Sequence, residues 1–135
     1  MDLPTITDWK SLSARAESEG KPVVIMVDQD HCPYCRRVEG EFFASIFAEG
    51  VLPEIALFGK ISIDEGELIT DENGETVGTR DFLGSYDTGF TPVILFLNHA
   101  KEEVAERIVG MLTPDFYGFY LEQAIRSAAD AVKLS

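Results

Sequence analysis

Residues 22–27, Pro-Val-Val-Ile-Met-Val, form an unbroken apolar run rich in β-branched side chains, and this run limits the possible folds most strongly. A strand of this composition is covered on both faces, as in a sheet that lies between helices. A second run of the same kind, Pro-Val-Ile-Leu-Phe-Leu, follows at residues 92–97. We attribute both runs to parallel strands covered by helices.

Helical and strand patterns alternate along the rest of the chain. The expected elements are a helix capped by Thr7 or Asp8 and ended by Gly20 and Pro22, a helix from Pro33 to Phe47 that Gly40 bends, a strand at 55–63, a hairpin of 67–70 and 75–78, a short helix at 79–86, a strand at 104–109 and a last helix that starts at Thr113-Pro114-Asp115. This order predicts an α/β fold with a mixed central sheet and helices on both faces. We expect one domain over residues 1–135, with a small hairpin and helix inserted at about residues 65–88 before the strand at 92–97.

The composition narrows the classes of partner. With 135 residues, 45% of them hydrophobic, the chain is large enough for one packed core without disulfide staples. Its net charge of −13 opposes binding to nucleic acids and to anionic membrane surfaces. No apolar run approaches the roughly 20 residues that a membrane helix needs. The sequence therefore predicts no nucleic-acid partner and no membrane insertion.

Cys32 and Cys35 are the only cysteines, and they stand where the first buried strand gives way to a helix. At a helix N-terminus the free backbone N–H groups and the positive end of the dipole favour a thiolate, so the pKa of Cys32 should fall. Pro33 suits the first helical turn, where its missing N–H costs nothing. Cys35 lies one turn deeper and can attack a mixed disulfide formed on Cys32. The spacing predicts Cys32 as nucleophile and Cys35 as resolving thiol.

A packing role or a metal site accounts for the cysteine pair less well than thiol-disulfide chemistry does. The two side chains could pack as small apolar groups, although the preceding strand and Pro33 favour chemistry. A structural zinc site needs four ligands, and only His31 and His99 stand beside the two cysteines as candidates. The acidic stretch from Asp64 to Glu75 does not have the spacing of a calcium loop. We therefore expect no metal and no bound cofactor.

Three features together resemble the thioredoxin superfamily: the strand Val23–Val27, the motif Cys32-Pro33-Tyr34-Cys35, and Thr91-Pro92 before an apolar strand. The resemblance covers essentially the whole chain, and Gly110 before a last helix fits it. It implies a thioredoxin fold and a thiol-disulfide oxidoreductase, mainly a reductase of protein disulfides, that receives electrons from another thiol protein. It also implies a cis bond at Thr91-Pro92, where the substrate chain is held, and a substrate surface lined by Pro33 and Tyr34. We expect a monomer.

The chain departs from cytosolic thioredoxins at two positions. His31 replaces the Trp before the first Cys. As a neighbouring cation it is expected to tune the pKa of Cys32, and the alternative is a solvated loop residue. Met26 replaces the buried acid that helps to deprotonate the resolving thiol, so Cys35 needs another route, such as water or Asp28. Arg36 and Arg37 are expected on an exposed helix face. Phe82 and Phe90 are expected in the core, with an apolar docking patch as the alternative.

A finer resemblance is to exported bacterial thioredoxin-like proteins with an elaborated middle. Asp71-Glu-Asn-Gly74, Phe82-Leu-Gly-Ser-Tyr86 and the stretch Gly89–Phe96 carry it. Some such proteins accompany sulfur-oxidation operons. This resemblance implies a periplasmic location in preference to a cytoplasmic one.

Alternative functions stay open at this stage. A disulfide-forming oxidase needs a destabilised Cys32–Cys35 disulfide and an oxidising partner. A glutaredoxin-like enzyme is suggested because Cys-Pro-Tyr-Cys is the glutaredoxin sequence. A redox-inactive protein-binding module would keep the fold and not use the cysteines.

Overall fold

A computed structural model describes residues 3–84, 86, 89–111 and 114–134 of the chain. In chain order its elements are α1 (Trp9–Glu19), β1 (Val23–Asp28), α2 (Pro33–Arg37), the π-helix η1 (Val38–Phe43), α3 (Ala44–Glu49), the 3₁₀-helix η2 (Leu52–Glu54), β2 (Leu57–Ser62), β3 (Leu68–Thr70), β4 (Thr76–Gly78), α4 (Thr79–Phe82), β5 (Val93–Leu97), β6 (Glu103–Val109) and α5 (Pro114–Leu134). No helix in these ranges is long and apolar enough to cross a membrane.

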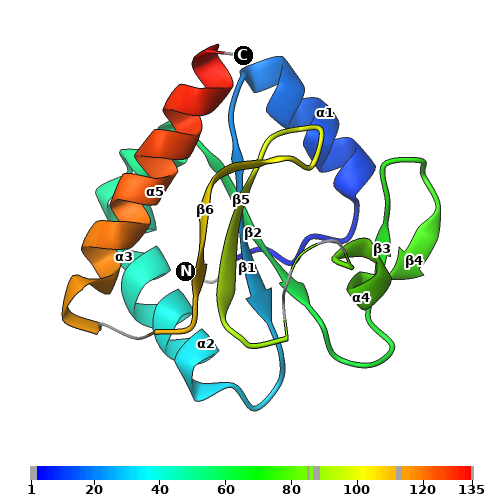
Figure 1. Ribbon diagram of the computed structural model, residues 1–135, viewed down its shortest axis with the longest axis horizontal. Coiled ribbons are helices and arrows are strands. Elements are labelled where there is room, and N and C mark those ends of the chain that lie inside the picture. The colour runs from blue at the N-terminus through cyan, green and yellow to red at the C-terminus, as the bar shows by residue number, and fades with distance from the viewer. Residues whose placement is uncertain (1–2, 85, 87–88, 112–113, 135) are drawn as a thin grey trace.

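The main sheet has four strands in the order β2-β1-β5-β6, and β3 and β4 form a separate hairpin. The mixed sheet between helices agrees with the predicted fold class (Figure 1). The directions assigned to the two apolar strands were wrong, because β1 and β5 run antiparallel and only β1 and β2 are parallel. Every residue of β1 and β5 is nevertheless buried. Their central place between two helical layers explains the apolar runs.

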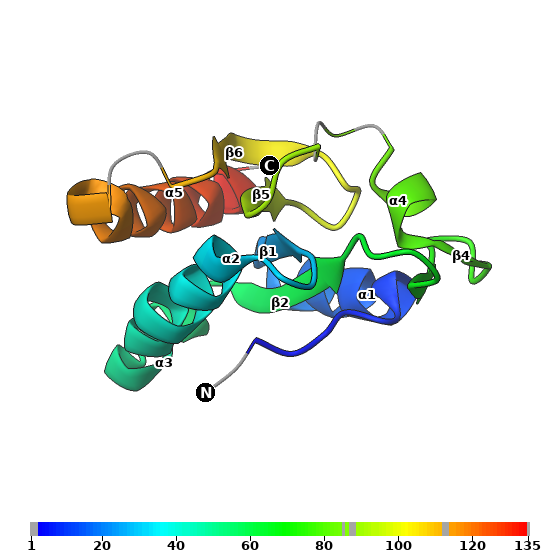
Figure 2. The same cartoon turned by 90° about the horizontal axis from the view of Figure 1, so that it is seen from below.

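Helices cover the sheet on both sides (Figure 1). On one side, α2, η1, α3 and α5 pack over a core that includes Met26 and Cys35. On the other side, α1 and α4 pack over a second core around Trp9. Successive strand residues point to opposite faces, so the single run of β1 supplies both cores. The hairpin and α4 lie at the far side of the sheet from α2 and α3 (Figure 2).

The long helical segment after Cys32 has the predicted extent but not a regular geometry. Its middle part, η1, is a π-helix that contains Gly40, the expected point of a bend. A left-handed Gly50, with φ of 77°, ends the segment after α3. The predicted helix at 79–86 is shorter and covers only α4, and Ser85 lies outside the described residues. Thr113, the expected cap of α5, lies outside them as well.

The N-terminal segment runs along the edge of β2 and continues to the hairpin. Its backbone bridges join Thr5 to Lys60 and Asp8 to Thr70. The approach is close at Gly59, where an added Cβ would meet the Ile6 side chain at 2.5 Å. The segment therefore ties the main sheet to the β3–β4 hairpin.

Candidate active site

Cys32 is the N-cap of α2, and its sulfur accepts a hydrogen bond from the backbone N–H of Cys35 at 3.1 Å. Pro33 is the first helical residue, as predicted. The two cysteines form a disulfide, with their Cα atoms 5.2 Å apart. Cys32 keeps 7% of its surface exposed and Cys35 keeps none. Of the two cysteines, only Cys32 therefore keeps any contact with solvent.

Thr91 and Pro92 come from a distant part of the chain and lie beside Cys32. Their peptide bond is cis, the geometry that the resemblance implies. The Thr91 hydroxyl lies 3.5 Å from the sulfur of Cys32. The carbonyl of Pro92 accepts a hydrogen bond from the N–H of Gly110 at 2.8 Å, which fixes this turn to the end of β6. The fold thus brings Thr91 to the cysteine pair.

Exposed side chains flank the pair on both sides. Tyr34 is 57% exposed and Pro33 is also exposed. Phe90, expected in the core, is instead 74% exposed, because it precedes the buried start of β5. Phe82 is buried as expected, with its ring 5.8 Å from that of Trp9. Tyr34 and Phe90 leave apolar surface near the exposed sulfur.

His31 is exposed and adopts a left-handed backbone conformation, with φ of 60°. A non-glycine residue in this conformation stores strain, and such residues cluster at functional sites. The loop before it is held by Asp30, whose N–H donates to the carboxylate of Asp64 at 2.9 Å. The strand end, the strained turn and the helix start therefore fix the direction in which Cys32 faces.

Two buried carboxylates lie close to the start of the helical segment. Asp28, at the end of β1, forms an ion pair with Arg36, which lies on an exposed face as predicted. This hydrogen bond raises the pKa of Arg36 above its ordinary value. Arg37 is also exposed and pairs with Glu41 on the surface. Asp28 is therefore already occupied by a cation.

Glu39 is the buried carboxylate that sequence reasoning missed. It is only 4% exposed and accepts hydrogen bonds from the Leu3 N–H at 2.7 Å and from the Lys60 amine at 3.0 Å. The one signal in the sequence was its position, four residues after Cys35 and four before Phe43, on the apolar face of the segment. An acid in that phase is expected to face the core.

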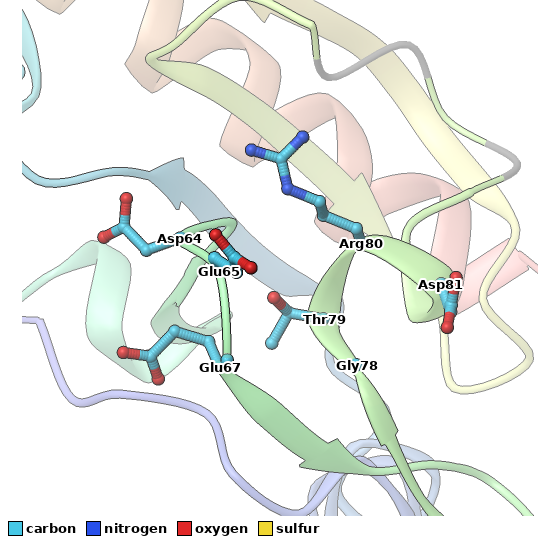
Figure 3. Close-up of a pocket in the computed structure, with 8 residues that line it drawn as sticks. Asp64, Glu65, Glu67, Gly78, Thr79, Arg80 and Asp81 are labelled. Carbon is cyan, nitrogen blue, oxygen red and sulfur yellow. The ribbon is translucent and has the colours of Figure 1, made fainter.

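A separate pocket of about 440 Å³ lies beside the start of the β3–β4 hairpin and α4. Figure 3 shows Asp64, Glu65 and Glu67 on one side of it, with Thr79 and Arg80 on the other. The Nε–H of Arg80 donates to the carbonyl of Ile63 at 2.7 Å. Within the part of the chain that the structure describes, no cluster of three or more His, Cys, Asp or Glu side chains is arranged to hold a metal ion.

The fold and the cysteine pair define a thiol-disulfide oxidoreductase of the thioredoxin class. A thioredoxin-like domain model matches residues 10–125, so the chain belongs to the thioredoxin-like domain family. None of the curated proteins matches the chain.

Solved structures of thioredoxins share the fold. A thioredoxin of Malassezia sympodialis is 16% identical, with 96% of this chain and 95% of that one covered and a TM-score of 0.64. Thioredoxin f from spinach chloroplasts is 17% identical, with coverages of 95% and 96% and a TM-score of 0.59. The periplasmic thioredoxin SoxS from Paracoccus pantotrophus is 19% identical, with coverages of 80% and 99% and a TM-score of 0.54.

Proposed function

We propose that this protein reduces disulfides in other proteins through the Cys32–Cys35 dithiol. One observation carries the proposal: Cys32 caps a helix at the surface, Cys35 lies one turn behind it, and Thr91 is 3.5 Å from the Cys32 sulfur. A helix N-terminus favours the thiolate that thiol-disulfide exchange requires. The proposal assigns Cys32 as the nucleophile and Cys35 as the resolving thiol.

The reaction has two exchange steps. In the first, the Cys32 thiolate attacks one sulfur of the substrate disulfide, an S–S bond forms between them, and the other substrate sulfur leaves as a thiolate that takes a proton from water. In the second, Cys35 gives up its proton and attacks Cys32, which releases the remaining substrate thiol. Two electrons pass to the substrate, and the protein ends with the Cys32–Cys35 disulfide. A thiol protein returns the pair to the dithiol by the reverse exchange.

The surface beside Cys32 supports binding of an extended substrate segment. Thr91 is half-buried and lies directly beside the sulfur, so a chain bound to Cys32 passes along the Thr91–Pro92 backbone. Tyr34 and Phe90 offer exposed apolar contacts, and Pro33 lies between the cysteines. We assign substrate binding to Thr91, Pro92, Pro33 and Tyr34, and the exposure of Phe90 supports the alternative that it contributes to docking. His31 has the role of favouring the Cys32 thiolate when it is protonated.

A periplasmic site of action belongs to the same proposal. The resemblance to exported bacterial proteins supports it, and one structural neighbour is a periplasmic thioredoxin. The partners are then protein disulfides and a thiol donor protein in that compartment, and the protein acts as a monomer. Immunodetection in periplasmic and cytoplasmic fractions of the native host checks the location, and a purely cytoplasmic signal rejects it.

The redox potential of the cysteine pair tests the direction of the reaction. Protein equilibrated in dithiothreitol and glutathione buffers is alkylated, and the mass shift gives the reduced fraction. A potential near that of thioredoxin, about −270 mV, is expected for a reductase. A value near −120 mV makes the protein a disulfide donor, and the absence of a reversible transition favours a binding module.

Single-cysteine variants test the two roles. With a protein disulfide as substrate, Cys35→Ser should accumulate a mixed disulfide through Cys32, because the resolving step is lost. Cys32→Ser should form no such adduct and should lose turnover. Full activity in Cys32→Ser contradicts the assignment.

A further inference from the structure

An open groove of about 390 Å³ lies between the last part of β6 and the first half of α5. The strand and the helix run side by side (Figure 1, Figure 2). Ile108 lines the groove from the strand, Gly110 lies just after it, and Tyr117, Tyr120 and Ala124 line it from the helix. Aliphatic and aromatic side chains thus make up most of its wall. The volume is within the range of natural ligand sites, so the groove can hold one large apolar side chain.

The hydroxyl of Tyr117 is a buried polar group at this groove. Tyr117 is only 3% exposed, and its hydroxyl makes no hydrogen bond within the described part of the chain. Buried polar groups are nearly always hydrogen-bonded, so an unpaired one calls for an explanation. Side-chain rotamers at interfaces commonly change on binding, so a chain in the groove can come within reach of this hydroxyl. A backbone carbonyl of that chain then supplies the missing acceptor.

The strand that forms one wall of the groove is an edge of the main sheet. In the described residues β6 pairs with β5 and with no other strand. An edge strand presents a row of unpaired backbone N–H and C=O groups, to which an extended peptide can add. Val109 and Tyr120 are 46% and 53% exposed, so apolar surface lies next to this edge. The groove therefore suits an extended polypeptide that carries an apolar side chain.

The groove is continuous with the surface beside Cys32. Its end at Gly110 is joined to the active-site turn, because the Gly110 N–H donates to the carbonyl of Pro92 at 2.8 Å. On the other side of that turn, the Thr91 hydroxyl lies 3.5 Å from the Cys32 sulfur. A substrate chain that passes along the Thr91–Pro92 backbone thus arrives where the groove begins. This continuity favours the substrate protein as the occupant.

We propose that the groove between β6 and α5 binds the substrate protein, by taking up a large apolar side chain a few residues away from the cysteine that reacts with Cys32. This inference rests on the proposed function and names its substrate class: disulfides in extended segments with a large apolar residue near the cysteine. Glu106 also lines the groove, and the net charge of the chain is −13. Acidic residues in the bound segment are therefore disfavoured.

Synthetic peptides test the preference. Each holds one cysteine as a mixed disulfide with 2-nitro-5-thiobenzoate and contains no acidic residue. The Cys32 thiolate attacks the peptide sulfur, the coloured thiobenzoate leaves with the bonding electron pair, and Cys35 then attacks Cys32 and releases the peptide thiol. Two electrons pass from the protein dithiol to the peptide disulfide, and the protein ends as the Cys32–Cys35 disulfide.

The peptides differ in one residue. Leu or Ala stands about three to six residues from the cysteine, on either side, because an extended chain covers about 3.4 Å per residue. At the best position, the second-order rate constant for thiobenzoate release should be about tenfold higher with Leu than with Ala. Equal rate constants at every position overturn the inference. They leave the proposed function intact, since the peptides are still reduced.

Two variants in the groove locate the contact. Tyr120→Ser removes part of the wall, so the Leu-to-Ala ratio should fall to about threefold or less. Tyr117→Phe should lower the rate constant with the Leu peptide about threefold, because the hydrogen bond to the bound chain is lost. This substitution removes an unsatisfied hydroxyl and should not weaken the fold, so urea unfolding separates the two effects. An unchanged ratio in Tyr120→Ser places the preference elsewhere and overturns the inference.

Leu68→Ser is the matched control. Leu68 is an apolar residue of similar exposure, 57%, on β3 of the hairpin, so its loss should leave the ratio unchanged. Light scattering tests whether a second copy fills the groove. A dimer that dissociates in Tyr120→Ser overturns the assignment to substrate. If the wild-type dithiol releases thiobenzoate from none of the peptides, the proposed function itself is rejected and the inference falls with it.

Discussion

The hydroxyl of Thr91 lies 3.5 Å from the sulfur of Cys32, although 59 positions separate the two residues in the sequence. The contact joins the start of α2 to the turn before β5. Because Cys35 is fully buried, a substrate sulfur can reach the pair only at Cys32, beside this contact. A substrate that approaches the sulfur of Cys32 therefore also approaches the side chain of Thr91.

Removal of the Thr91 hydroxyl should weaken the nucleophile. In Thr91→Val the shape is kept but the hydrogen bond to the Cys32 thiolate is lost, a change of about 0.5–1.5 kcal/mol. The rate of iodoacetamide alkylation of the reduced protein at pH 7 should fall about threefold. Thr76→Val, at an exposed position of β4, is the control and should react as the wild type does. An unchanged rate in Thr91→Val contradicts a role for this hydroxyl.

Tyr117 carries a hydroxyl that is buried and has no hydrogen-bond partner among the described residues. An unsatisfied buried polar group costs about 1–3 kcal/mol. Tyr117→Phe should therefore raise the free energy of unfolding by about 1 kcal/mol, as measured in urea. Tyr120→Phe, at a position that is 53% exposed, should change it by less than about 0.5 kcal/mol. A clear loss of stability in Tyr117→Phe means that the hydroxyl is bonded.

The same tyrosine should make stability depend on alkaline pH. Burial raises the pKa of Tyr117 in the folded protein, whereas in the unfolded chain it lies near its ordinary value of about 10. Above pH about 10 the unfolded chain loses this proton first, so the free energy of unfolding falls by up to about 1.4 kcal/mol per pH unit. Tyr117→Phe lacks this contribution, and its advantage over the wild type should grow above pH 10. If the free energies of unfolding of the two proteins change with pH in parallel above pH 10, Tyr117 does not cause the pH dependence.

Gly59 should tolerate no side chain. An added Cβ would lie 2.5 Å from Cγ1 of Ile6 and 3.1 Å from the backbone carbonyl of Pro4, so the N-terminal segment has to move. Gly59→Ala should lower the free energy of unfolding by about 1–3 kcal/mol. Gly40→Ala meets nothing within 4 Å and lies in the helical segment, so it should raise stability by about 0.5–1 kcal/mol. Equal effects of the two substitutions contradict the close approach at Gly59.

Local patterns were sufficient for most of the fold. The buried strands, the caps of α1 and the hairpin turn each depend on a few neighbouring residues, and the structure places them where expected. Strand direction does not depend on local residues, because β1 and β5 are buried to the same degree in either direction. The antiparallel pairing of these strands was missed for that reason.

The candidate site was predictable in part. The spacing at the start of a helix was enough to predict the roles of Cys32, Pro33 and Cys35. Glu39 gave only one signal, its position on the apolar face of the segment, and its partners Leu3 and Lys60 come from two other segments. The exposure of Phe90 could not be predicted either. Phe90 directly precedes a buried strand, and its exposure depends on the path of the turn before that strand.

The N-terminal segment is connected, through the β3–β4 hairpin and Asp64, to the loop that leads to Cys32. Its bridges from Thr5 to Lys60 and from Asp8 to Thr70 fasten the β3–β4 hairpin to the main sheet by backbone hydrogen bonds. The hairpin is thus braced at its base. Asp64, which holds the loop before Cys32, lies between β2 and this hairpin. The loop that leads to Cys32 is therefore tied, through Asp64, to the same segment that the N-terminal bridges hold.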